Sequence, residues 1–138
     1  MQDTHIKCWR KGFKCFIVAE DYHFETDIRP DEDIDCDLIS ITKDGQGVLK
    51  KYYSSDGPSG PTDPTADAIR AALKHDAIYY LIRELILKPS DKDIADREFE
   101  SECREDGMSH FRSDFFFEGV HEFGKYCAEG GNPVIVYP

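Results

Sequence analysis

The chain has no CxxC pair and no apolar run long enough to cross a bilayer. Its five cysteines are odd in number and widely spaced, which argues against a disulfide framework and against a zinc ribbon. We therefore expect reduced thiols in a reducing compartment. The N-terminus lacks the continuous apolar core of a signal peptide, so we expect synthesis and folding in a cytoplasm without integral membrane association.

Positive charge is scarce: the 138 residues carry a formal net charge of −11, and the isoelectric point is about 4.8. Because nucleic acid and anionic membrane surfaces repel such a chain, we expect no nucleic-acid partner. The basic residues near the N-terminus are Lys7, Arg10, Lys11 and Lys14. Trp9 and Phe13 lie among them, and either dock on a neighbouring subunit or belong to the core.

The composition, with 40% hydrophobic residues, is that of one globular domain of ordinary size. We predict an α+β domain: antiparallel β hairpins at the N-terminus, then three helices and a short C-terminal strand. The predicted parts are a β-rich segment over 1–53, a Gly/Pro loop over 54–64, a helical segment over 65–128 and a tail over 129–138.

Four segments rich in β-branched and aromatic residues predict the strands, at 14–20, 22–26, 38–42 and 48–53. The turn between the last two contains Asp44 and Gly45, a pair that is typical of β hairpins. Five acidic residues crowd into 31–37, and we interpret that segment as a solvated loop. It lacks the glycine and the terminal glutamate of a calcium-binding EF-hand loop.

Helical periodicity predicts helices over 65–87, 91–105 and 111–128, with a strand over 134–137. Ser90 is the expected cap of the second helix, and Gly107 is expected to end it. The expected polar face of the first helix consists of Asp67, Arg70, Lys74, Glu84 and Lys88.

His75 and Asp76 lie away from that polar face, where an ionisable side chain is costly unless it has a partner. His75 and Tyr79 are four residues apart and share one helical face. If the first two helices pack antiparallel, Asp96 comes within reach of His75. A carboxylate in that position would fix the tautomer of the imidazole and raise its basicity.

HDxxY at His75–Tyr79 and DxxF at Asp96–Phe99, after a Gly-rich loop, resemble the catalytic core of phospholipase A2, especially the disulfide-free domain of parvovirus capsid proteins. The resemblance implies that His75 is the general base, that Asp96 orients it and that Tyr79 supports Asp96. It also implies a Ca²⁺ site made by Asp76 and loop carbonyls from Gly57 to Gly60. The cysteines that flank the motif in secreted phospholipases are absent here.

A longer stretch, from about Leu38 to Ala128, resembles small proteins of unknown function from tailed phages and prophages. The matching segments are SSDGPSGP, AALKHDAIYY, ADREFESECREDGM and FFFEGVHEFGKY. This resemblance implies a phage source, a place in the virion or its assembly, and residence in the host cytoplasm or the virion. It implies no particular activity.

The same polar residues also fit a purely structural role, as a satisfied cluster that joins two helices, with no cofactor. Phe115, Phe116 and Phe117 cannot all be buried on one face of a helix, so at least one is expected at an interface. We therefore expect a non-catalytic protein that contacts other phage structural proteins or itself. The alternative is a calcium-dependent lipid ester hydrolase.

Overall fold

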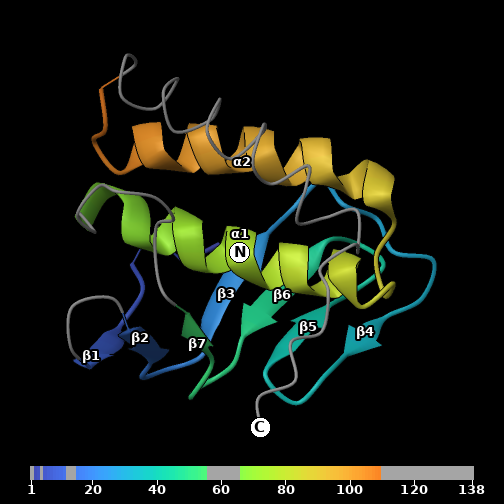
Figure 1. Cartoon of the computed structure of the whole chain (residues 1–138), viewed down its shortest axis with the longest axis horizontal. Coiled ribbons are helices and arrows are strands. Elements are labelled where there is room, and N and C mark those ends of the chain that lie inside the picture. The colour runs from blue at the N-terminus through green and yellow to red at the C-terminus, as the bar shows by residue number, and fades with distance from the viewer. Residues whose placement is uncertain (1, 4, 12–14, 56–65, 110–138) are drawn as a thin grey trace, which may run out of the picture.

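The computed structural model describes residues 2–3, 5–11, 15–55 and 66–109 (Figure 1). Two small antiparallel sheets in the N-terminal half are followed by helices, which confirms the α+β prediction. The strands are β1 (Cys8–Lys11), β2 (Cys15–Val18), β3 (Tyr22–Glu25), β4 (Ile34–Asp35), β5 (Ile39–Ile41), β6 (Gln46–Leu49) and β7 (Ser54–Ser55). One sheet has the order β1-β2-β7, and the other has the order β3-β6-β5-β4.

The hairpin between β5 and β6 turns at Gly45, as the Asp-Gly pair predicts. The backbone of Gly45 has φ +83°, a conformation that glycine adopts without a steric penalty. Gly47 falls between the two predicted strands, 38–42 and 48–53, but it lies within β6 and pairs with Phe24 of β3. A Cβ atom at Gly47 would lie 2.1 Å from Cζ of Phe24, so the ring takes the place of a side chain.

The predicted strand over 48–53 is wrong beyond β6, which ends at Leu49. The chain turns at 50–53, where the amide of Tyr53 donates to the carbonyl of Lys50 at 3.0 Å. Tyr52 has φ +79°, so the alternation of an extended strand cannot continue through it. After the turn, β7 joins β2, with Ser54 opposite Ile17. The sequence did not reveal β1, β4 or β7.

The described residues then form two α-helices, α1 (Ala66–Arg83) and α2 (Lys92–Glu105), with a 3₁₀ turn at Pro89–Asp91 between them. The first helix was predicted to reach residue 87, but it ends at Arg83. The amide of Ile86 donates to the carbonyl of Leu81, and the amide of Leu85 donates to Ile82. With Leu85 at φ +60°, these bonds form a Schellman motif that terminates α1.

The second helix agrees with its predicted range, and Gly107 follows it with φ +103°. Ser90 is not its cap, because Ser90 lies inside the 3₁₀ turn and Asp91 holds the N-cap position. The predicted helix over 111–128, the predicted strand over 134–137 and most of the predicted 54–64 loop lie outside the described residues.

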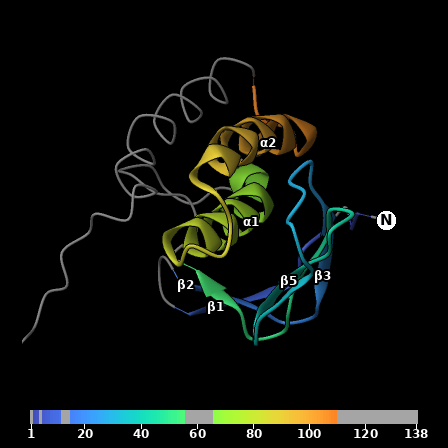
Figure 2. The same ribbon diagram turned by 90° about the vertical axis from the view of Figure 1, so that its right-hand side faces the viewer.

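The described elements form three layers, which Figure 2 shows from the side: the sheets, then α1, then α2. The helix α1 packs between the other two layers, so it is buried on more than one face. The face of α1 toward the sheets is apolar. Its residues Leu73, Ile78 and Leu81 are buried in one core with Phe24 and Leu49. In the part of the chain that is described, no helix is long and apolar enough to cross a membrane.

The prediction of an exposed polar face on α1 is wrong for two of its members. Arg70 is only 5% exposed and Lys74 only 2%. Both side chains lie under α2, whose inward-facing carboxylates supply their partners. Sequence periodicity identifies which residues share a helical face. It does not show whether that face is exposed or is buried against another helix that supplies partners for its charges.

Candidate functional site

His75 on α1 and Asp96 on α2 meet in the buried interface of the two helices. Nε2 of His75 lies 2.8 Å from Oδ1 of Asp96, and the hydroxyl of Tyr79 donates to the same oxygen. Asp96 is fully buried, and the side chains of His75 and Tyr79 are buried beside it. The antiparallel packing that was a condition of the sequence prediction is present, since Arg70 contacts Asp106 near the other end of the pair.

Lys92, which was not predicted from the sequence, completes this buried cluster. Its Nζ donates to Oδ2 of Asp96 at 2.8 Å, one helical turn away on α2. Burial alone raises the pKa of Asp96, but the hydrogen bonds from His75, Lys92 and Tyr79 outweigh it and hold that pKa below its usual value. Asp96 is therefore an anion with a donor on each oxygen.

Aromatic rings pack around the imidazole of His75. Its centroid lies 4.1 Å from that of Tyr79 and 5.1 Å from that of Phe99, both in tilted arrangements. His75, Tyr79 and Phe99 thus make apolar contacts as well as polar ones across the helix interface. We call His75, Tyr79, Lys92 and Asp96 the interhelical cluster.

Asp76, the implied calcium ligand, is directed to β7 instead of α2. The hydroxyl of Ser55 donates to its Oδ2 at 2.5 Å, and the side chain is half-buried. Burial, and secondarily the charge of Asp76, raise the pKa of the nearby Tyr53. Among the described residues there is no group of three His, Cys, Asp or Glu side chains that is arranged to hold a metal ion.

The rest of the helix interface is a network of buried ion pairs. Arg70 donates to both oxygens of Asp106 and to the hydroxyl of Tyr22. Lys74 is paired with Glu102, and its Nζ lies 2.9 Å from Oε2 of Glu98. Burial lowers the pKa of Arg70, but the hydrogen bonds that Arg70 donates to Asp106 and Tyr22 raise it above its usual value overall.

Glu102 is the least satisfied member of this network. Burial raises its pKa, although Lys74 and Arg70 oppose that shift. Its Oε2 is buried without a hydrogen-bond partner in the described part of the molecule, and Nη1 of Arg70 lies 3.8 Å away. Arg70 and Lys74 are therefore each shared among more than one carboxylate.

Of the site residues predicted from the sequence, the structure brings together His75, Tyr79 and Asp96 and places Asp76 apart from them. Gly57, Gly60 and the three phenylalanines at 115–117 lie outside the described residues. Lys92 had a signal in the sequence, because it precedes Asp96 by four residues on one helical face. Two surface hollows among the described residues are lined by other side chains, at 29–36 with 85–91 and around Glu98.

Comparison of the chain with protein-family models, with curated proteins and with solved structures finds no match.

Proposed function

We propose that this chain is a non-catalytic component of a phage-type particle or of its assembly, and that the interhelical cluster joins α1 to α2. The observation that carries the structural role is the environment of Asp96. Its two oxygens accept from His75, Tyr79 and Lys92 in a fully buried position.

Lys92 distinguishes this arrangement from that of a general base with its orienting carboxylate. A base that takes a proton from water becomes an imidazolium, and the adjacent carboxylate stabilises that charge. Here the ammonium of Lys92 already neutralises the same carboxylate, 2.8 Å from its second oxygen. Less of the negative charge of Asp96 is then left to stabilise a protonated His75.

The assignment to a particle is supported by the resemblance of residues 38–128 to phage and prophage proteins. It is also supported by large apolar side chains on the surface, which suit contacts with other proteins. The three phenylalanines at 115–117 are the predicted interface for phage structural proteins. The proposal includes the predicted helix over 111–128, which contains these phenylalanines.

Quantitative mass spectrometry of purified particles tests the assignment. Particles released by a strain that encodes the chain should contain it in a fixed ratio to the major capsid protein. A ratio that falls to background during density-gradient purification would contradict a place in the virion. Recovery of the chain from unfilled assembly intermediates would then separate an assembly role from no role in the particle.

A calcium-dependent lipid ester hydrolase is the second candidate, because one observation favours it. Nε2 of His75 faces Asp96 and Tyr79 supports the same carboxylate, as the phospholipase A2 resemblance implies. In this reading Nδ1 of His75 takes the proton of the attacking water. Of the implied calcium ligands only Asp76 is among the described residues, and the hydroxyl of Ser55 donates to it, so these residues alone do not make a calcium site.

Calorimetric titration with Ca²⁺, followed by a fatty-acid release assay on the same sample, tests this candidate. The hydrolase reading expects calcium binding that Asp76→Asn removes and that the matched control Asp44→Asn retains. Asp44 is exposed in the β5–β6 turn, so its substitution changes the charge equally without affecting the cluster. Equal calcium binding by both variants would exclude Asp76 as a ligand.

A further inference from the structure

Two exposed aromatic residues form one surface feature on the first sheet, where Trp9 comes from β1 and Tyr52 from the turn before β7. Trp9 and Tyr52 are 49% and 62% exposed, and their rings stack with the centroids 5.9 Å apart. Nζ of Lys51 lies 5.8 Å from the ring centroid of Trp9 and 5.1 Å from that of Tyr52. We call Trp9, Lys51 and Tyr52 the aromatic platform, a cation held over apolar rings that face solvent.

The backbone holds the aromatic platform in place. The amide of Tyr52 donates to the carbonyl of Val18 at 2.8 Å, and Tyr53 closes the turn by donating to Lys50. Tyr52 occupies a position with φ +79° where glycine is usual. The amide of Lys51 donates to Asp21 at 2.8 Å, which ties the turn to the segment between β2 and β3. The ring of Tyr52 is therefore presented by a fixed turn.

A surface groove of about 720 Å³ has the complementary chemistry. It lies between the 29–36 segment and the 85–91 segment, and five carboxylates and two cations line it: Asp31, Glu32, Asp33, Asp35, Asp91, Arg29 and Lys88. Nζ of Lys88 donates to Asp31, and the backbone amide of Lys88 donates to Asp91. Arg29 donates to the carbonyls of Thr26 and Ile28. We call this feature the acidic groove.

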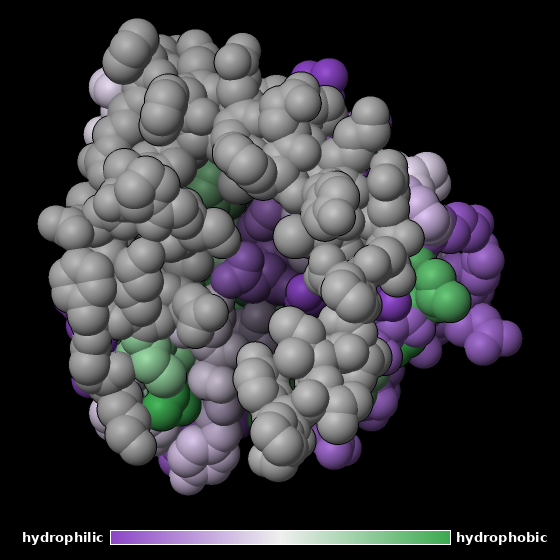
Figure 3. Space-filling model, viewed as in Figure 1, coloured by the Kyte–Doolittle hydropathy of each residue, from purple (hydrophilic) through white to green (hydrophobic). Residues whose placement is uncertain are grey.

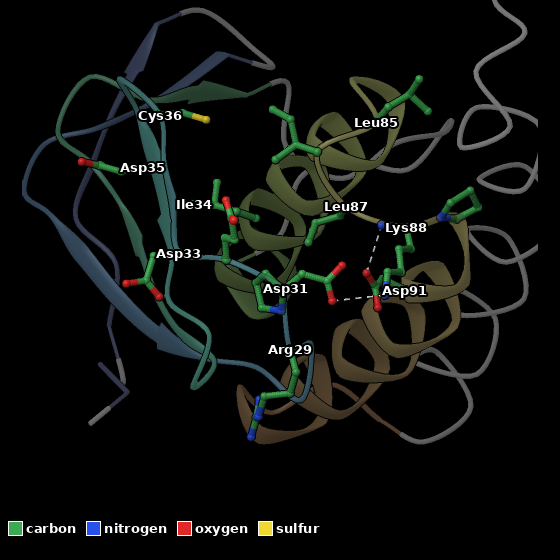
Figure 4. A pocket seen from close by; sticks show the side chains of 14 residues that line it. Arg29, Asp31, Asp33, Ile34, Asp35, Cys36, Leu85, Leu87, Lys88 and Asp91 are labelled. Atoms are coloured by element: carbon green, nitrogen blue, oxygen red, sulfur yellow. Dashed lines mark hydrogen bonds and ion pairs between the residues drawn. The ribbon is translucent and has the colours of Figure 1, made fainter.

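The acidic groove also has apolar walls. Figure 4 shows Ile34 and Leu87 facing each other across it, with Asp31 directed toward Lys88 and Asp91. Two further apolar lining residues, Leu85 and Ile86, are 81% and 44% exposed. A groove of this size, with apolar walls and a net negative charge, suits aromatic side chains that have a cationic side chain beside them.

We propose that the aromatic platform of one copy docks in the acidic groove of a second copy. The charges are complementary, since the platform presents Lys51 and the groove has three more carboxylates than cations. Figure 1 places β1, which carries Trp9, and β4, which lines the groove, at opposite sides of the sheets. The contact is therefore head-to-tail, and repetition would give a ring or a linear chain of subunits.

The net charge of −11 opposes any self-association, so the local pairing has to outweigh it. At physiological ionic strength, repulsion between charges is screened beyond about 8 Å, whereas charges in contact are screened much less. Where described residues are visible in Figure 3, apolar side chains form small patches next to hydrophilic ones. Localised anchors of this kind favour a specific contact over general aggregation. This inference rests on the proposed role in assembly.

Sedimentation velocity on the full chain tests the proposal by measuring self-association of variants in which the charge of one surface residue is reversed. Lys51→Glu reverses the platform, and Glu32→Lys reverses an exposed groove residue. Each variant alone should associate at least roughly tenfold more weakly than the wild type. An equimolar mixture of the two should associate again, because the unaltered platform of the Glu32→Lys variant then meets the unaltered groove of the Lys51→Glu variant. Lys43→Glu and Asp44→Lys are matched controls, since both are exposed and outside both surfaces.

Several results would overturn this docking: a wild type that stays monomeric at every concentration, association that either reversal leaves intact, or a mixture that does not recover. Controls that weaken association as much as the reversals would overturn it too. These outcomes are distinct from failure of the proposed function. A monomeric chain that is present in purified particles refutes the docking alone, and an associating chain that is absent from particles and their intermediates refutes the role in assembly.

Discussion

Asp96→Asn is the substitution that tests the interhelical cluster most sharply. The asparagine has nearly the same shape, but it carries no charge and replaces one acceptor oxygen with a donor. Asp96 is fully buried, and the Lys92 side chain is only 10% exposed, so the substitution leaves an ammonium in the interface without its carboxylate. Removing one partner of such a pair costs about 3–5 kcal/mol. That is a large part of the 5–15 kcal/mol by which a domain is typically stable.

A double-mutant cycle with Lys92→Met separates the pair from the rest of the cluster. Removing Lys92 in the Asp96→Asn background takes away the unpaired charge, so the double variant should be more stable than the sum of the single losses predicts. We expect a coupling of about 1–3 kcal/mol. Urea unfolding followed by circular dichroism at neutral pH measures all four free energies. A cost below about 1 kcal/mol for Asp96→Asn, or a coupling within about 0.3 kcal/mol of zero, would refute the reasoning.

Further predictions concern the backbone and pH. Leu85→Gly should raise the unfolding free energy by about 1 kcal/mol, because Leu85 is mostly exposed at φ +60°; a loss of stability in urea would show that its side chain matters. Gly47→Ala should lower it by about 1–3 kcal/mol, since its Cβ overlaps the ring of Phe24; an unchanged midpoint would contradict the packing. Because the pKa of Asp96 is lower in the folded state, its contribution is full above the unfolded value of about 4 and is lost as pH falls below it. Acid titration should therefore lower the unfolding free energy of the wild type more than that of Asp96→Asn. Equal losses in the two proteins would count against the lowered pKa of Asp96.

Local sequence signals predicted much of the fold. The Asp44–Gly45 pair located the β5–β6 turn, because its chemistry is set by two adjacent residues. The range of α2 followed from its helical periodicity and from Gly107 after it. Elements of two residues, such as β4 and β7, carry no periodicity, and they form only because a neighbouring strand offers backbone partners.

Interactions between residues far apart in the sequence, and unusual backbone conformations, account for most of the wrong predictions. Arg70 and Lys74 are typical of an exposed face, and only the carboxylates of α2, some thirty residues later, make their burial possible. The end of α1 could not be read from its apolar pattern, because Leu85 adopts a backbone conformation that sequence rules reserve for glycine. The strand expected over 48–53 failed for the same reason at Tyr52.

The candidate site was predictable in part. The spacing of His75 and Tyr79, together with an ionisable residue on an apolar face, identified a cluster and its partner Asp96. The interaction of Lys92 with the same carboxylate changes how that cluster is interpreted. It was missed because a lysine four residues before an aspartate is common on exposed helices, and its burial depends on the packing of α1.

His75→Ala, measured for stability and for activity on the same preparation, distinguishes a structural cluster from a catalytic one. A structural cluster predicts a loss of roughly 1–3 kcal/mol in unfolding free energy, from the partners that the substitution leaves unsatisfied. It also predicts no calcium-dependent fatty-acid release by either protein. Release by the wild type that His75→Ala abolishes, with the unfolding free energy unchanged, would contradict the account and identify the chain as the hydrolase.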